Sequence, residues 1–154
     1  AFMVLGYLMG LVIIPKFVNQ AQALSGSAIL GLVLSVVIVF SDPQSTQISA
    51  ILWGWMGIAL LPDPVTLIAI LGFANALVWP AIWPLALDGL YSLTARGSAL
   101  LIMGISGGAI LPMLYGVLAE HFDGQSAYWM MLPCYAFILF YALKGHKIRA
   151  WKKA

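Results

Sequence analysis

Long apolar runs without a charged residue alternate with short polar stretches along the chain. A helix needs about 20 apolar residues to cross the hydrocarbon core of a membrane, because it rises about 1.5 Å per residue. Four runs reach this length once their polar ends are trimmed. They cover about 24–41, 65–86, 98–118 and 126–143. The pattern therefore predicts an all-α fold, a polytopic membrane helical bundle in which these four segments are spans.

The first run, residues 1–15, is shorter than a span and ends before Lys16. The chain opens on an alanine, with no initiator methionine and no basic stretch ahead of the apolar residues. A secretory signal peptide would begin with such a basic stretch. We expect 1–15 to be the end of a truncated spanning helix, and the chain to be a fragment of a longer protein.

The run 43–62 is ambiguous, because its polar start leaves only about 48–61 apolar. Fourteen residues fit an interfacial or re-entrant segment better than a span. Trp53 and Trp55 suit the membrane interface, since an indole combines an apolar body with a polar N–H. We expect this segment to lie at the outer interface.

Charge placement decides the number of spans. With five spans, all seven Lys and Arg residues lie on one side of the membrane, as the positive-inside rule asks. If 48–61 crossed the membrane, Lys16 would lie opposite the other six basic residues. We therefore expect five spans in a single membrane domain, residues 1–154, that ends in a basic cytoplasmic tail at 144–154.

Composition narrows the class of protein further. Hydrophobic residues make up 63% of the 154 residues and charged residues only 8%, whereas a soluble domain carries about 25% charged residues. These values exclude a soluble globular domain and a disordered chain, and a net charge of +2 excludes a nucleic-acid binder. The single cysteine, Cys134, and the two histidines, His121 and His146, lie apart, so we expect no metal site and no cofactor.

The best candidate for binding chemistry is the second of the four long runs, which carries Pro80 and Pro84. Each proline bends the helix and frees a carbonyl group that needs protein, water or substrate as a partner. Asn75, Trp79 and Trp83 are four residues apart and share one helix face. An amide and two indoles suit a sugar, because the amide bonds hydroxyl groups and the indoles pack on the C–H face of the ring. The alternative is that Asn75 bonds a neighbouring helix and the tryptophans pack or anchor.

A second distinctive stretch contains three glycines and a proline, Gly104, Gly107, Gly108 and Pro112. Small residues let helix backbones approach closely, and glycine weakens a helix by about 1 kcal/mol relative to alanine. We expect this stretch to serve close packing and to act as a hinge, with Pro112 adding a bend. Direct substrate contact is the alternative there, through Met103 or Ser106.

No charged residue lies in the middle of a predicted span. Such a residue is the usual mark of a proton or sodium relay, so either the protein is no ion-coupled carrier or its coupling residue lies elsewhere. Asp88 follows the proline-rich helix, either as a solvated charge or in a gating contact with Arg96 or another basic residue. No nucleophile with a base and no carboxylate pair occurs at membrane depth, so we expect no enzyme.

Two stretches resemble the carboxy-terminal half of bacterial sugar permeases of the major facilitator superfamily. They read GFANALVWPAIWPLALDGL at 72–90 and GSALLIMGISGGAILP at 97–112. Within that superfamily they are most similar to the fucose–galactose–glucose:proton symporter family. The resemblance implies that the chain is the last five of twelve helices and that the Asn75–Trp79 helix lines a central cavity. It also implies that the coupling ion, proton or sodium, is handled by the missing amino-terminal half.

The residues and the resemblance together predict a secondary active symporter for monosaccharides such as glucose, galactose or fucose, working by alternating access. Asn75 would bond the sugar, and Trp79 would stack on it. The expected partners are the sugar, the bilayer and the missing half, and the expected location is the bacterial inner membrane with a cytoplasmic carboxy terminus. The alternatives are an N-acetylhexosamine carrier of the same fold and a non-transporting structural subunit.

Overall fold

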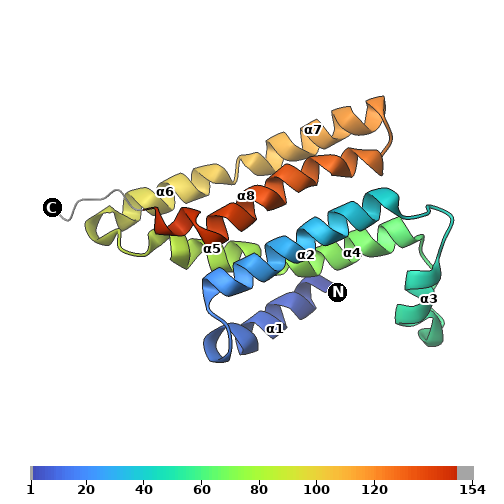
Figure 1. The fold of residues 1–154 in the computed structure, drawn as a ribbon, viewed down its shortest axis with the longest axis horizontal. Coiled ribbons are helices and arrows are strands. Elements are labelled where there is room, and N and C mark those ends of the chain that lie inside the picture. The colour runs from blue at the N-terminus through green and yellow to red at the C-terminus, as the bar shows by residue number, and fades with distance from the viewer. Residues whose placement is uncertain (1, 149–154) are drawn as a thin grey trace.

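The computed structural model describes residues 2–148, and these residues form helices and no strand (Figure 1). The helices are α1 Phe2–Lys16, α2 Gln20–Phe40, α3 Gln47–Trp53, α4 Asp63–Ala76, α5 Val78–Leu87, α6 Thr94–Gly104, α7 Gly107–His121 and α8 Met131–Leu143. Four short 3₁₀ helices join or follow the α-helices. They are η1 Gly54–Met56 after α3, η2 Tyr91–Leu93 before α6, η3 Ser126–Met130 before α8 and η4 Gly145–Lys147 after α8. The predicted all-α fold class is confirmed.

Four helical stretches of the described chain are long and apolar enough to cross a membrane. They are Gln20–Phe40, Asp63–Leu87, Tyr91–His121 and Ser126–Leu143. Two of them combine two α-helices, since α4 continues into α5 and α6 into α7. α1 contributes a shorter apolar stretch, Phe2–Val12. The helices thus follow the long apolar runs of the sequence, and the number of spans and the extent of the domain stay predictions.

α2 lies at the centre of the bundle and packs against α4, α5 and α8 (Figure 1). Its apolar side chains enclose the main cluster of buried residues, which we call the α2 core. This core consists of Leu34 and Ile38 of α2, Leu67 and Leu71 of α4, and Tyr135 of α8. Burial of such side chains contributes about 25 cal/mol per Å² of apolar surface removed from water, and less where lipid is the alternative.

α1 packs along α4 through glycine. A Cβ built on Gly6 would lie 2.6 Å from the Cβ of Ala76, and one built on Gly10 would collide with the side chain of Leu77. The contact at Gly6 leaves no space for a larger residue, because the atoms it meets are a Cβ and a backbone oxygen, whereas the Leu77 side chain at Gly10 is flexible. The small residues of the first apolar run therefore serve close helix packing, as small-xxx-small patterns do in membrane helices.

The connection between α2 and α4 folds back on the start of α4. The buried carboxylate of Asp63 accepts hydrogen bonds from the Ser45 hydroxyl and, at 2.9 Å, from the backbone N–H of Ile48. The Ser49 hydroxyl donates to the carbonyl oxygen of Leu61 at 2.8 Å. These bonds hold α3 as a short helix at one end of the bundle, in the segment predicted to be interfacial (Figure 1). Its place in a membrane stays a prediction.

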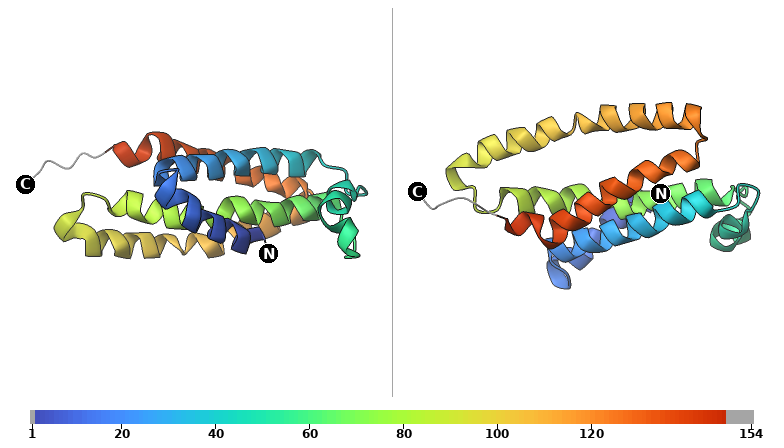
Figure 2. Two further views of the ribbon diagram at one scale, coloured as in Figure 1. Left: turned by 90° about the horizontal axis from the view of Figure 1, so that it is seen from below. Right: turned by 45° about the horizontal axis from the view of Figure 1, so that its top comes forward.

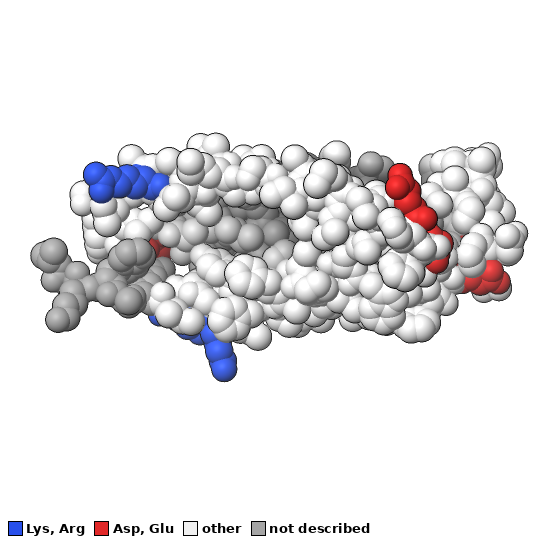
Figure 3. Space-filling model, turned by 90° about the horizontal axis from the view of Figure 1, so that it is seen from above, with Lys and Arg blue, Asp and Glu red and all other residues white. Residues whose placement is uncertain are grey.

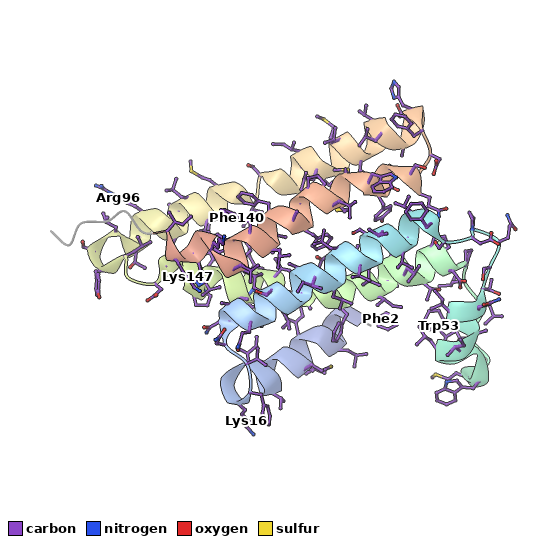
Figure 4. The ribbon with its side chains drawn as sticks, in the orientation of Figure 1. Phe2, Lys16, Trp53, Arg96, Phe140 and Lys147 are labelled. Atoms are coloured by element: carbon purple, nitrogen blue, oxygen red, sulfur yellow. The ribbon has the colours of Figure 1, made fainter. Side chains whose placement is uncertain are left out.

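On the face shown in Figure 3, basic side chains gather toward one end of the described bundle and most acidic side chains toward the other. Asp88 is the acidic exception, since it lines a pocket together with Lys147. Lys16, Arg96 and Lys147 all lie toward the end remote from Trp53 (Figure 4). This arrangement agrees with the sidedness that the positive-inside rule predicts. Lys144 of the predicted tail is described as well, whereas Arg149, Lys152 and Lys153 lie outside the described residues.

α6 and α7 form an arm, residues 94–121, that runs along the length of the bundle and is set apart from α8 in the right view of Figure 2. α6 contacts α5 at one end of the arm, and α7 contacts η3 at the other. Neither helix contains a buried residue. We call this unit the α6–α7 arm, and its exposed surface contrasts with the packed α2 core.

Candidate functional site

The proline-rich helix is broken just before its first proline. α4 ends at Ala76, Leu77 has φ −91° and ψ −10°, and α5 begins at Val78. Pro80 has no N–H to donate to the carbonyl of Ala76, so the helix cannot run through this point with regular bonding. Regular bonding resumes where the N–H of Ala81 donates to the Leu77 carbonyl at 3.1 Å. Pro84 lies inside α5.

A pocket of about 340 Å³ adjoins this break. It is lined by Tyr7 and Gly10 of α1 together with Leu77 and Pro80, among others. A freed backbone group at membrane depth needs a protein or cavity partner, and a pocket at the break provides the space for one. The broken helix therefore borders a cavity, which is the environment that its sequence predicts.

Asn75 lies in the last turn of α4 and is exposed. Its side-chain oxygen Oδ1 accepts a hydrogen bond from the hydroxyl of Tyr135, at 2.7 Å. Tyr135 belongs to α8, so this bond joins two of the long helices. Asn75 therefore makes the bond to a neighbouring helix that the alternative interpretation predicts. Because Asn75 is also exposed, its amide remains accessible to a ligand.

Trp79 and Trp83 lie one turn apart on α5 and contact each other. Their ring centroids are 5.6 Å apart and the rings are tilted by 55°. Trp79 is 43% exposed, and Trp83 is half-buried. The pair presents an aromatic surface on the helix that follows Asn75, which is the kind of surface on which a sugar ring packs.

Met103 and Ser106 lie at the junction of α6 and α7. Met103 is 69% exposed and Ser106 is also exposed. The helix is interrupted between Gly104 and Gly107, where the N–H of Ser106 donates to the Met103 carbonyl at 3.1 Å. The predicted hinge region thus coincides with a break in the helix.

Gly104, Gly107 and Gly108 make no close contact within the described residues, because a Cβ built on any of them would meet no atom within 4 Å. Their role in close packing and the bend at Pro112 stay predictions. Pro112 itself sits inside α7. It frees only the carbonyl of Gly108, close to the start of α7, where a lost bond interrupts little.

The five candidate contact residues do not line the pocket at the helix break or two further pockets on the described surface. One of these two, about 780 Å³, takes part of its lining from Asp88, His146 and Lys147. Arg96 lines a different pocket of about 470 Å³. Among the basic residues considered for Asp88, the structure therefore brings Lys147 to the same pocket, and not Arg96.

Tyr135 is a site residue that the sequence does not reveal. It sits in a continuous apolar run, and nothing in its spacing relates it to Asn75, which is 60 positions earlier. Only the packing of both α4 and α8 against α2 brings its hydroxyl to the amide. A tyrosine in such a run is more commonly a packing residue or an interface anchor.

Several curated proteins are similar to this chain. The "Glucose/galactose transporter" of Brucella abortus biovar 1 (strain 9-941) is 32% identical over 132 residues, which is 86% of this chain and 28% of that protein. The "Putative glucose/galactose transporter" of Helicobacter pylori (strain J99) is 40% identical over 81 residues, which is 49% of this chain and 20% of that protein. No family model and no solved structure matches the chain. The chain spans 28% of the length of the Brucella relative, and the relatives are named as transporters and not as enzymes.

Proposed function

Because this chain is a homologue of part of the glucose/galactose transporters of Brucella and Helicobacter, we propose that it forms part of a membrane carrier for monosaccharides. The observation that carries the proposal is the similarity over 86% of the chain to a protein of that name. The four long apolar helical stretches of the described residues agree with a multi-pass membrane protein.

The substrate site proposed here is the surface that follows the helix break. Asn75 offers an exposed amide, and Trp79 and Trp83 offer adjacent indole rings on α5. An amide bonds sugar hydroxyl groups, and an indole packs on the weakly polar C–H face of a pyranose. Asn75 would therefore bond glucose or galactose while Trp79 stacks on its ring.

The transport mechanism proposed is symport by alternating access. The binding surface would lie near the middle of the membrane, between this chain and the other half of the protein. The coupling ion, proton or sodium, would be bound by that other half, since the predicted spans here carry no charge at mid-depth. The carrier would reside in the bacterial inner membrane, with Lys16, Arg96 and Lys147 on the cytoplasmic side.

The test is sugar uptake by the whole protein that contains this chain, reconstituted into liposomes with and without a proton or sodium gradient. We expect uptake of glucose and galactose, and we expect Asn75→Ala or Trp79→Ala to raise KM by about tenfold, which corresponds to about 1.4 kcal/mol. Trp55→Ala is the matched control, because Trp55 is 80% exposed on η1, far along the chain from the proposed site. Unchanged uptake in both site variants would reject this site assignment.

A further inference from the structure

Tyr135 is a polar residue within the apolar α2 core. Its side chain is 3% exposed and packs in one cluster with Leu34, Ile38, Leu67 and Leu71. A buried hydroxyl needs a hydrogen-bond partner, and the Tyr135 hydroxyl donates to Oδ1 of Asn75 at 2.7 Å. A phenol has one proton to donate, so this bond uses it.

Gly31 of α2 fixes the position of the Tyr135 ring. A Cβ built on Gly31 would collide with the ring, and its distance to the ring atom Cζ would be 2.6 Å. The backbone of α2 and the ring of Tyr135 are therefore in direct contact, and the ring has no room to move toward α2. The contact with α2 therefore restricts the positions from which the hydroxyl can reach Asn75.

This bond determines which end of the Asn75 amide remains available. An amide has one oxygen that accepts and one NH₂ group that donates. With Oδ1 engaged by Tyr135, a half-turn of the amide would leave the buried phenol proton without its acceptor. The orientation with NH₂ away from Tyr135 is thus the favoured one, and the exposure of Asn75 leaves that NH₂ group accessible to a ligand.

We propose that Tyr135 is a positioning residue that makes Asn75 a hydrogen-bond donor toward the sugar. This inference rests on the proposed function and adds a specificity rule to it. At its contact with Asn75, the sugar needs an atom that accepts a hydrogen bond, and the proton of its hydroxyl group is not required. An analogue in which that hydroxyl is replaced by fluorine keeps a weak acceptor, whereas a deoxy analogue lacks one.

The experiment is competition of labelled galactose uptake by deoxy and deoxyfluoro galactose analogues, position by position, in the whole protein. At the position that contacts Asn75, the fluoro analogue competes better than the deoxy analogue in the wild type. Tyr135→Phe raises KM by about three- to tenfold with little change in kcat, and it reduces that preference, because the released amide can turn and accept. Tyr128→Phe is the matched control, since Tyr128 is half-buried and packs edge-on against Tyr115, 5.4 Å away.

A second pair of variants, both in α2, tests the positioning of Asn75 by Tyr135. Gly31→Ala displaces the ring of Tyr135 and has the effect of Tyr135→Phe, with reduced discrimination between the two analogues. Gly26→Ala on the same helix is the control, because a Cβ there meets no atom within 4 Å. Protein yield and melting temperature of each variant separate a change of selectivity from a loss of folded protein.

The outcomes distinguish this inference from the proposed function. If Asn75→Ala impairs uptake while Tyr135→Phe leaves both KM and the analogue preference unchanged, the positioning role is rejected and the binding site stands. If Asn75→Ala itself leaves uptake unchanged, the positioning role falls, and the site assignment falls with it when Trp79→Ala is also without effect.

Discussion

Helix α2 and the α6–α7 arm have similar composition and very different surroundings. In α2, Ile38 is fully buried and Gly31 is covered by an aromatic ring. In the arm, Ile110 is 60% exposed and Gly108 faces open space (Figure 2). Both regions are apolar and rich in small residues. These features allow a helix to pack closely, but they do not determine which surface it packs against. The arm carries an apolar surface that the described residues do not cover, which suits lipid or the remainder of a longer transporter.

The largest expected difference is in the loss of stability when an isoleucine is replaced by alanine in each of the two regions. Ile38→Ala should destabilise the protein by about 2–5 kcal/mol, because it opens a cavity in the α2 core. Ile110→Ala should change the free energy of unfolding by less than about 0.5 kcal/mol, because the side chain is largely exposed. Thermal unfolding of both variants in detergent measures the difference. Equal destabilisation in the whole protein would mean that the arm is covered there as tightly as the core.

Gln125 ties the turn after the arm to the core, and its loss should have an intermediate effect. Its Nε2 donates to the carbonyl oxygens of Ile38 at 2.7 Å and Ser41 at 2.6 Å, at the carboxyl end of α2. Gln125→Ala removes both bonds and should cost about 1–3 kcal/mol. Gln44→Ala, in the exposed loop after α2, is the control. Hydrogen exchange at the end of α2 should quicken in the first variant and not in the second; equal exchange in both would show that Gln125 does not hold this junction.

The smallest expected effect is the pH dependence of the stability of the turn that follows the α6–α7 arm. A side-chain hydrogen bond from Ser126, with backbone bonds from Ser126 and Gln125, holds the pKa of Asp123 below its ordinary value. A lowered pKa in the folded state means that these bonds stabilise the turn above the ordinary carboxyl pKa, about 4, and that this contribution is lost as pH falls below it. Asp123 is fully exposed, so the effect should be small. A titration of wild type and Asp123→Asn below pH 5 checks it, and identical curves would contradict the assignment.

The sequence predicts the fold well because length and hydropathy are properties of each segment alone. The runs around 24–41 and 126–143 are helical for that reason, and Pro80 marks the helix break to within a few residues. Contacts between segments are a different matter. Neither the Tyr135–Asn75 bond nor the open space around Gly108 follows from spacing, because each depends on which helices meet. The candidate site could therefore be predicted as a helix face, but the residue that orients it could not.

Counterflow shows whether the whole protein that contains this chain carries sugar. Liposomes that contain the whole protein are loaded with unlabelled galactose and diluted into trace labelled galactose. We expect a transient accumulation of label above that of empty liposomes, which unlabelled glucose reduces and which is much smaller for Asn75→Ala. No accumulation above empty liposomes, with folded wild-type protein present, would contradict the proposed function.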